Sequence, residues 1–264
     1  MGATLSGEGP NHLPNKEKQL HFTDCSRSAQ PENVKEFLYV TAAGLLVKSL
    51  KQAEGRNLIA PVFRPVTICV MFTGIVEETG EVLSLAEHKA AWRLRLRART
   101  ILRGLRLGDS VAVNGCCLTV AKKARGVLEF DLLEETLRRT NLGEVVQGSP
   151  VNLERSVARD GRFGGHFVTG HIDCVGDVKI FKRVGKNYYL RVSFPKKFDK
   201  YVAEKGSITI DGVSLTLAEV GAASFVVWLI PHTLKITNLG VIKSGSRVNL
   251  EFDLLAKYAE RMKK

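Results

Sequence analysis

The chain has 264 residues, of which 44% are hydrophobic and 25% are charged, and its formal net charge is +12. This length allows one or two domains with substantial cores, and the composition is that of an ordinary globular protein. No run reaches the roughly 18 apolar residues of a membrane span. Five cysteines without paired spacing argue against a disulfide framework and favour a reducing compartment.

Residues 1–70 share no pattern with the rest of the chain. Residues 1–33 are polar and contain three prolines, which predicts disorder. The next apolar residues recur at helical spacing and predict one amphipathic helix. They are Val34, Phe37, Leu38, Ala42, Leu45, Leu46 and Leu50.

Two interpretations of residues 1–70 stay open. The segment is either an organelle-targeting presequence or an extension (or upstream start) without a structural role. Its six acidic residues argue against a transit peptide. The first six residues fit a myristoylation pattern, but so short a match is weak.

From Met71 onward the sequence is an internal duplication of about 97 residues. Five blocks recur in the same order, nearly all at an offset of 97. The pairs are Thr73–Gly80 with Thr169–Gly176, Trp92–Leu96 with Tyr188–Val192, Asn114–Val120 with Asp211–Leu217, Phe130–Gly143 with Val227–Gly240, and Val151–Glu154 with Val248–Glu251.

Each copy alternates short runs of Val, Ile, Leu, Phe and Thr with Gly, Asn and Asp turns, a pattern typical of an all-β barrel or sandwich. Helical patterns are brief, around 195–202 and after Asp253. Leu254, Leu255, Tyr258 and Met262 predict a C-terminal helix of about three turns, which should pack on its own barrels or on a neighbouring subunit.

The copies differ where side chains carry chemistry. Ile75, Asn114, Cys117 and Ser156 of the first copy correspond to His171, Asp211, Ser214 and Asp253 of the second. The second copy is therefore richer in acid–base and nucleophilic groups. Each position also has an ordinary explanation: a buried thiol, a strand hydroxyl, a turn carboxylate, or a histidine that donates to backbone. His166, after Gly164 and Gly165, has the same ordinary explanation.

Nucleotide and metal sites have no motif in the sequence. Gly-x-Gly-x-x-Gly, P-loop, His-Glu-x-x-His and Cys-x-x-Cys patterns are missing, and adjacent Cys116 and Cys117 should point to opposite faces of a strand. The positive charge raises a nucleic-acid interpretation, but Arg93, Arg95, Arg97 and Arg99 alternate with apolar residues as on a strand with one solvated face.

Several motifs together resemble the alpha chain of riboflavin synthase. They are Met-Phe-Thr-Gly-Ile-Val-Glu (71–77), Asn-Gly-Cys-Cys-Leu-Thr-Val (114–120), Glu-Thr-Leu-Arg-Arg-Thr-Asn-Leu-Gly (135–143), Gly-Gly-His-Phe-Val-Thr-Gly-His-Ile (164–172), Ile-Asp-Gly-Val-Ser-Leu-Thr (210–216) and Ile-Pro-His-Thr-Leu (230–234). The resemblance runs from Met71 to about Asp253. Residues 1–70 lie outside it and would suit a plant enzyme with a plastid presequence.

The resemblance implies two tandem Greek-key, six-stranded β-barrels, each binding a lumazine, at 71–167 and 168–253, followed by a short C-terminal helix at 254–264. It also implies a homotrimer in which the first barrel of one subunit faces the second barrel of another. In the implied reaction, two molecules of 6,7-dimethyl-8-ribityllumazine dismutate to riboflavin and 5-amino-6-(D-ribitylamino)uracil, the last step of riboflavin biosynthesis. Neither a metal nor an organic cofactor takes part.

The family's ligand-contacting segments can be placed on this sequence. In the first copy they are Gly74, Ile75, Val76, Cys117, Leu118, Thr119, Asp131, Leu132, Leu133, Glu134, Glu135 and Thr136. In the second copy they are Gly170, His171, Ile172, Lys205, Ser214, Leu215, Thr216, Trp228, Leu229, Ile230, Pro231, His232 and Thr233.

Positions implicated in catalysis correspond to Phe72, Cys117, His171, Asp211, Ser214 and Asp253. Our hypothesis is that Ser214, or water held by it, adds to the acceptor ring. Asp211 and Asp253 would orient Ser214, His171 would assist proton transfer, and Cys117 would line the partner site. The tail after Asp253 is shorter than in bacterial members of the family, which would leave less helix to hold a trimer together.

Two rival functions remain. Tandem barrels of this kind could hold a lumazine or flavin without turning it over, as lumazine proteins do, and a nucleic-acid-binding barrel is suggested by charge alone. Further expectations are a chloroplast location, with cytoplasm as the alternative, and an association with lumazine synthase. We expect neither nucleic acid nor membrane as a partner.

Overall fold

The computed structural model describes residues 71–88, 91–158 and 160–263 in full, and the backbone of 36–40, 46–51 and 57–58. The chain divides into two compact units, Met1–Val66 and Thr67–Lys264, which are described separately. In the first unit, β1 (Glu36–Val40), β2 (Leu46–Lys51) and β3 (Asn57–Leu58) form an antiparallel sheet in that order.

The amphipathic helix predicted within residues 34–50 is wrong. Strands β1 and β2 occupy this segment, with Phe37 opposite Ser49 and Val40 opposite Leu46. Helical spacing and two short apolar runs fit the same residues, and Gly44 separates the two runs in the sequence, which favours a strand pair over one continuous helix. The predicted disorder of residues 1–33 lies outside the described residues.

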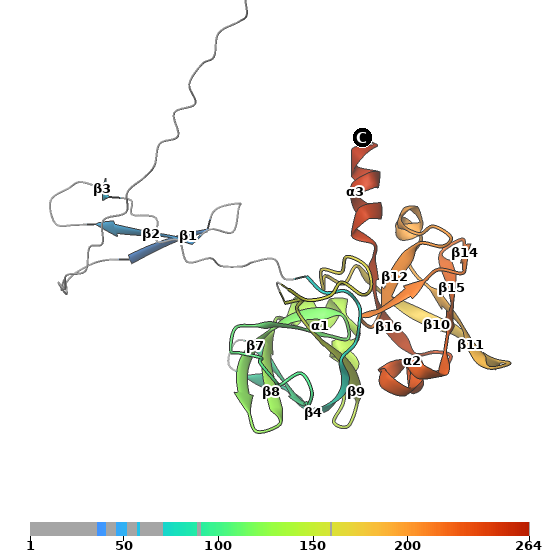
Figure 1. Ribbon diagram of the computed structural model, residues 1–264, viewed down its shortest axis with the longest axis horizontal. Helices are drawn as coiled ribbons and strands as arrows, with labels where there is room; N and C mark the ends of the chain where they lie inside the picture. The colour runs from blue at the N-terminus through green and yellow to red at the C-terminus, as the bar shows by residue number, and fades with distance from the viewer. Residues whose placement is uncertain are drawn as a thin grey trace, which may run out of the picture. The chain divides into compact units, whose positions relative to one another are not determined.

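The second unit begins with a closed six-stranded barrel, shown in teal through green to yellow in Figure 1. Its strands are β4 (Glu78–His88), β5 (Ala91–Arg97), β6 (Ser110–Val113), β7 (Cys116–Ala124), β8 (Val127–Leu132) and β9 (Pro150–Arg155). The order around the barrel is β4-β5-β8-β7-β6-β9, all antiparallel. Consecutive strands that are not neighbours make this a Greek key, as expected.

Alternation along β5 explains how the sequence forms this barrel. Leu94 and Leu96 are fully buried in the barrel core, whereas Arg95 and Arg97 between and after them face solvent. Arg97 pairs with Glu81 and Arg93 pairs with Asp131 on neighbouring strands. The run of arginines is therefore the solvated face that the sequence predicted.

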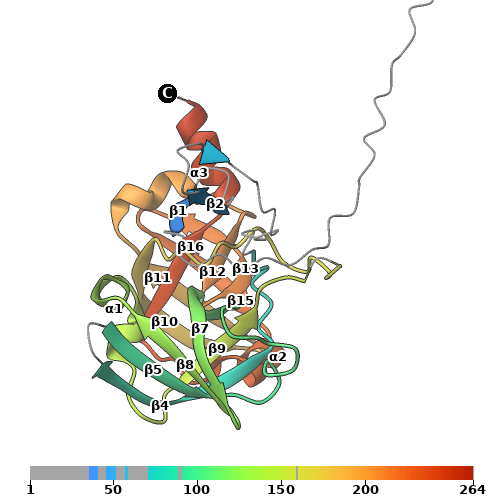
Figure 2. The ribbon, with the colours of Figure 1, turned by 90° about the vertical axis from the view of Figure 1, so that its left-hand side faces the viewer.

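The second barrel repeats this plan with one strand interrupted, shown in orange to red in Figures 1 and 2. Its strands are β10 (Cys174–Val184), β11 (Asn187–Ser193), β12 (Ser207–Ile210), β13 (Val213–Thr216), β14 (Glu219–Gly221), β15 (Ser224–Leu229) and β16 (Arg247–Phe252). They form one sheet in the order β13-β12-β16-β10-β11-β15-β14.

The prediction of six strands is corrected to seven in this second sheet. β7 of the first barrel pairs with both β6 and β8 and closes the ring. Its counterpart leaves the ladder at Leu217 and Ala218, so β13 pairs with β12 while β14 pairs with β15. The two halves of one interrupted strand thus form the two ends of the sheet.

Short helices connect or follow the strands. They are α1 (Glu134–Arg139), η1 (Asn141–Glu144), η2 (Lys196–Tyr201), α2 (Pro231–Ile236), η3 (Asn238–Gly240) and α3 (Leu254–Met262). The predicted C-terminal helix is confirmed as α3, which extends away from the barrels in Figure 1. The expected packing of its apolar side is not seen in the single chain, since Leu255, Tyr258 and Met262 are exposed.

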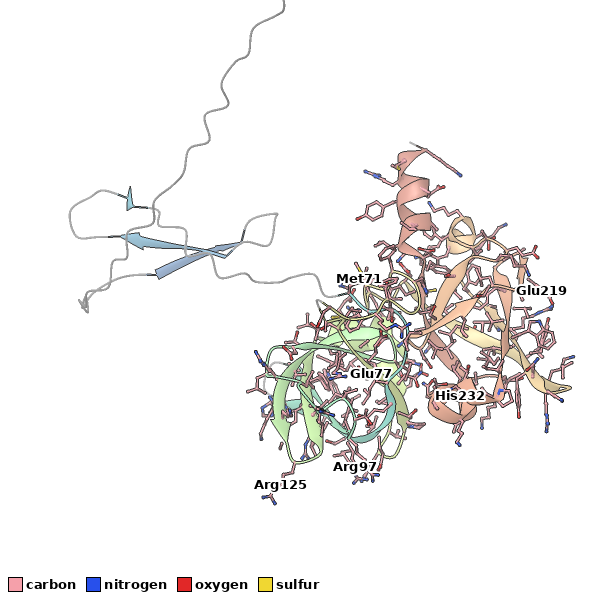
Figure 3. The ribbon with its side chains drawn as sticks, in the orientation of Figure 1. Met71, Glu77, Arg97, Arg125, Glu219 and His232 are labelled. Carbon is pink, nitrogen blue, oxygen red and sulfur yellow. The ribbon has the colours of Figure 1, made fainter. Side chains whose placement is uncertain are left out.

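Two exposed charged residues mark the ends of this unit that are far from the junction of the barrels. Arg125, between β7 and β8, projects from the first barrel away from the second, and Glu219 lies on the far side of the second barrel (Figure 3). Among the described residues, no helix is long and apolar enough to cross a membrane.

Candidate functional site

The two barrels meet through crossed backbone segments just before their first strands. The Ser214 N–H in the second barrel donates to the Gly74 carbonyl at 2.8 Å, and the Cys117 N–H in the first barrel donates to the Gly170 carbonyl, also at 2.8 Å. Phe72 and Val168 exchange backbone hydrogen bonds with each other. The Thr-Gly segment of each repeat (Thr73–Gly74 or Thr169–Gly170) therefore hydrogen-bonds to the barrel of the other repeat, around a local pseudo-twofold axis.

Packing follows the same crossing. Ile172, from the second repeat, packs on the core of the first barrel, and Val76, from the first repeat, packs on the core of the second. The predicted ligand segments therefore group across the repeats: Gly170 to Ile172 lie with Cys117, and Gly74 to Val76 lie with Ser214. The sequence alone did not indicate this exchange, because the repeat pattern is the same whether or not the segments cross.

Two glycines make the crossing possible. Gly74 has φ +78° and Gly170 has φ +79°, a region that L side chains rarely adopt. A Cβ on Gly74 would lie 2.7 Å from the Ser214 Cβ, and one on Gly170 would lie 2.5 Å from the Cys117 Cβ. Each reactive residue is therefore pressed against the backbone of the other repeat.

Ser214 has a histidine partner that the sequence interpretation did not choose. The ring Nδ1 of His166 lies 2.8 Å from the Ser214 Oγ, and the backbone N–H of His166 donates to the Thr73 carbonyl at 3.1 Å. Burial lowers the pKa of His166, and the nearby Asp253 carboxylate raises it in part. A half-buried, neutral imidazole on a serine hydroxyl is an arrangement suited to general acid–base chemistry.

The predicted orienting groups occupy other places. His171 is exposed beside Gly170 on the Cys117 side. Asp253 caps α3 by accepting from the Leu255 N–H at 2.9 Å and acts on His166 electrostatically. The only sequence signal for His166 was its place after two glycines, and no pattern linked it to Ser214, which lies 48 positions away.

Asp211 is fully buried in a polar network between the barrels. Its carboxylate accepts hydrogen bonds from the Asn141 and Asn238 side-chain amides, each at 2.9 Å, and from the Asn249 N–H at 2.7 Å. Burial raises its pKa to about 6, although these three donors lower it. These contacts tie the two repeats together.

The network is nearly symmetric. Its members, all buried, are Asn114, Asn141, Asn152, Asp211, Asn238 and Asn249. The Asn141 N–H donates to Asn249 and the Asn238 N–H donates to Asn152, each at 2.7 Å. Asn152 and Asn249 donate to the Asp211 and Asn114 carbonyls, each at 2.9 Å. Asp211 is thus the single carboxylate of this set, at the position that Asn114 occupies in the first repeat.

Cys117 is the thiol at the position that Ser214 occupies in the second repeat. Cys117 is half-buried, and burial raises the pKa of its thiol although a hydrogen bond with Ser110 lowers it in part. Cys116 points into the first barrel core, as the strand alternation predicted. Phe72 is fully buried and packs with Ala112, Val168 and Cys117, so it supports the site through packing. A thiol with a raised pKa is less readily ionised, and the thiolate is the nucleophilic form of cysteine.

The remaining predicted contacts lie at equivalent positions in the two repeats. The exposed Leu133 and Ile230 precede α1 and α2 at equivalent positions. Further exposed or half-buried members are Thr119, Asp131, Glu134, Glu135, Thr136, Lys205, Leu215, Thr216, Trp228, Pro231, His232 and Thr233. Leu118, Leu132 and Leu229 are buried in the barrel cores, so they can offer a ligand only their backbone.

The two repeats differ at one pair of facing residues on neighbouring strands. In the first barrel, Arg93 holds Asp131 with hydrogen bonds of 2.8 and 3.1 Å. At the equivalent place in the second barrel, Tyr189 meets Trp228 edge-on with ring centroids 5.3 Å apart. The first barrel thus presents a charged pair at this place, and the second presents an aromatic surface on which a flat heterocycle can stack.

A cavity of about 510 Å³ lies behind the Thr73–Gly74 segment. Thr73, Ile75, Glu154 and Ser156 are among its lining residues. None of the predicted ligand residues except Ile75 lines it. In the described part of the chain, no group of three or more His, Cys, Asp or Glu side chains is arranged to hold a metal ion.

Comparisons with known proteins identify relatives of both repeats. The lumazine binding domain family matches twice, at residues 73–156 and 169–253. A riboflavin synthase of Actinobacillus pleuropneumoniae is 46% identical over 72% of this chain and 89% of its own length. One of Mycobacterium tuberculosis is 47% identical over 73% of this chain and 98% of its own length.

Solved structures show the same fold. A crystal structure of LumP complexed with 6,7-dimethyl-8-(1'-D-ribityl) lumazine has a TM-score of 0.62 and 27% identity, and covers 69% of this chain and 98% of that chain. A crystal structure of LumP complexed with riboflavin has a TM-score of 0.64 and the same identity, with 69% of this chain and 99% of that chain covered.

Proposed function

We infer that this chain, which belongs to the riboflavin synthase family, transfers a four-carbon unit between two molecules of 6,7-dimethyl-8-ribityllumazine. The products are riboflavin and 5-amino-6-(D-ribitylamino)uracil. The observation that carries this conclusion is the match to riboflavin synthases over both repeats at 46–47% identity. Two related pockets in one chain suit a reaction that uses two copies of one substrate.

The chemistry needs a proton removed from the C7 methyl of one lumazine and a nucleophile added at C7 of the other. We assign the second requirement to Ser214, or to water that it holds. With its proton on Nε2, neutral His166 accepts from the Ser214 Oγ at 2.8 Å and takes that proton as the oxygen adds to the ring. His166 thereby replaces His171 as the proposed proton-transfer group, and Asp253 stabilises the imidazolium that forms.

The other proposed contacts position the rings. The Cys117 and Thr119 face, with Asp131 to Thr136, holds one lumazine beside Gly170 and His171. The Ser214 and Thr216 face, with Trp228 to Thr233, holds the other beside Gly74 and Ile75. Holding both reactants in place supplies much of the rate in a reaction between two bound molecules.

A turnover assay tests this function. Purified protein is incubated with 6,7-dimethyl-8-ribityllumazine, and riboflavin and the pyrimidine are quantified by chromatography. The expected result is one molecule of each for every two lumazines consumed, with turnover reduced in Ser214→Ala. A tight lumazine complex without riboflavin would instead support the rival binding function, which the LumP complexes with lumazine, riboflavin and flavin mononucleotide suggest.

We also propose a homotrimer, in which the first barrel of one subunit faces the second barrel of another. The exposed apolar residues Leu255, Tyr258 and Met262 on α3 support a helix that packs on a neighbour. Analytical ultracentrifugation of the full chain should give three times the mass of 29.1 kDa. A monomer at assay concentration that still forms riboflavin would contradict it.

For residues 1–70 we propose a chloroplast presequence, with a cytoplasmic extension as the alternative. The support is that the family match begins at residue 73. A fluorescent fusion of residues 1–70 expressed in leaf cells separates the two. Association with lumazine synthase is a further proposal, which co-sedimentation of the two purified proteins tests.

A further inference from the structure

Two buried carboxylates, Glu154 in β9 and Glu251 in β16, have no part in the proposed chemistry. Glu154 accepts hydrogen bonds from the Thr73 N–H at 2.8 Å, the Thr73 Oγ1 at 3.2 Å and the Gly74 N–H at 3.1 Å. Glu251 accepts the matching three, from the Thr169 N–H and Oγ1 at 2.7 Å each and from the Gly170 N–H at 2.9 Å. Each therefore fixes the Thr-Gly segment of its own repeat.

Those segments are the ones that cross to the other barrel. The Gly74 carbonyl receives the Ser214 N–H, and the Gly170 carbonyl receives the Cys117 N–H. Each glycine is thus held on one side by a carboxylate of its own repeat and on the other side by the reactive residue of the opposite repeat.

We propose that Glu154 and Glu251 are crossed positioning residues: Glu154 of the first repeat places Ser214 of the second, and Glu251 of the second repeat places Cys117 of the first. The proposal rests on the proposed function, because it takes Ser214 and Cys117 as the key residues of the two lumazine pockets. Neither carboxylate touches the reacting atoms in this arrangement.

The close packing at the crossing makes the link direct. A Cβ on Gly74 or Gly170 would lie within 2.8 Å of atoms of Ser214 or Cys117, so a displacement of either segment must move the residue it contacts. On the Ser214 side the Thr73–Gly74 segment also contacts His166, because the Thr73 carbonyl accepts a hydrogen bond from the backbone N–H of His166 at 3.1 Å. Glu154 therefore places both members of the Ser214–His166 pair.

The carboxylates are also distinguishable by charge. The negative charge of Glu251 contributes to raising the pKa of Cys117. Glu154 lies beside the cavity of about 510 Å³, and burial raises its pKa to about 7.

Gln substitution leaves an acceptor for the Thr bonds but turns an N–H₂ group toward the Gly N–H, so one hydrogen bond is lost with little change in volume.

A thiol-reactivity experiment tests the crossing without relying on turnover. Iodoacetamide labelling at Cys117 is followed by mass spectrometry in a Cys116→Ala background, alone and with Glu251→Gln or Glu154→Gln. A second reporter, Ser214→Cys with Cys117→Ser, carries the same two Gln substitutions. Exposed Glu87→Gln in β4, outside the proposed contacts, is the matched control, and circular dichroism establishes that each variant is folded.

The expected result is crossed. Labelling rates are measured over a range of pH and compared as rate constants of the thiolate, so that the lost charge of Glu251 does not contribute. Glu251→Gln should raise this rate constant at Cys117 by about fivefold, the factor that corresponds to losing one hydrogen bond, and Glu154→Gln should leave it unchanged. The reverse should hold for the Ser214→Cys reporter. Equal effects of both Gln variants on both reporters, or an effect of each carboxylate only within its own repeat, would overturn the proposal.

Activity adds a separate outcome. If the labelling is crossed but the wild type forms no riboflavin, the positioning holds and the proposed function fails. If the wild type forms riboflavin while neither reporter responds, the function stands and the positioning proposal is overturned.

Discussion

At the scale of single residues, His166 and Ser214 make the sharpest prediction about activity. His166→Gln keeps a hydrogen bond to the Ser214 Oγ but removes the proton acceptor, so kcat should fall by about 10²–10³-fold. The same change at His88, at the end of β4, is the control and should leave kcat unchanged. Steady-state kinetics with lumazine measures both. A large loss in His171→Gln together with wild-type kcat in His166→Gln would restore the interpretation made from the sequence.

Asp211 carries a prediction about pH and stability. Burial raises its pKa from 3.8 to about 6, so the folded state holds this proton more tightly than the unfolded chain does. The free energy of unfolding should therefore fall as the pH rises from about 4 to about 6, by ~3 kcal/mol for this group. Below about pH 4 the group is protonated in both states, and this part of the slope ends.

Urea unfolding of the wild type and Asp211→Asn at several pH values isolates this contribution. Glu154 and Glu251 also have raised pKa values and burial lowers the pKa of His166, but these groups are common to both proteins and cancel in the difference. The free energy of unfolding of the wild type, minus that of Asp211→Asn, should fall by ~3 kcal/mol as the pH rises from about 4 to about 6. Parallel curves for the two proteins would show that Asp211 does not bind its proton in the folded state near pH 6.

At the scale of elements, the sequence predicts well what depends on local patterning. The duplicated strands, the solvated face of β5 and the C-terminal helix follow from spacing alone. Two errors have local causes as well. The apolar runs of residues 34–50 fit both a helix and a strand pair, and the break between β13 and β14 involves only Leu217 and Ala218, a length at which strand ends are not set by pattern.

What the sequence could not show is the crossing of elements between repeats. A Thr-Gly segment has the same sequence whether it packs on its own barrel or on the other, and the hydrogen bonds of Gly74 and Gly170 decide between the two only in three dimensions. For the same reason the sequence did not indicate which of the predicted site residues lie together in space. Ser214 was a candidate from the sequence, whereas His166, whose ring hydrogen-bonds to it, lies in the stretch between the two repeats.

At the scale of the whole second unit, the crossing implies that the two barrels unfold together. Val76 and Ile172 each complete the core of the opposite barrel, and the buried network around Asp211 joins the two repeats. Separating the barrels would expose these apolar side chains and leave buried amides without partners, which is costly. A state with one barrel folded and the other unfolded should therefore be scarcely populated.

The two tryptophans of the chain allow this to be measured, because Trp92 lies in β5 of the first barrel and Trp228 in β15 of the second. The variants Trp92→Phe and Trp228→Phe each keep one tryptophan. In each variant, tryptophan fluorescence should show one urea transition, and its midpoint should equal the midpoint measured by circular dichroism on the same variant. The decisive variant is Leu94→Ala, which truncates a fully buried side chain in the first barrel and should cost about 2–5 kcal/mol. If the barrels are coupled, it lowers the midpoint reported by Trp228 as much as that reported by Trp92. A Trp228 midpoint that stays in place would mean that the barrels are independent domains, and the crossed segments would then contribute position without shared stability.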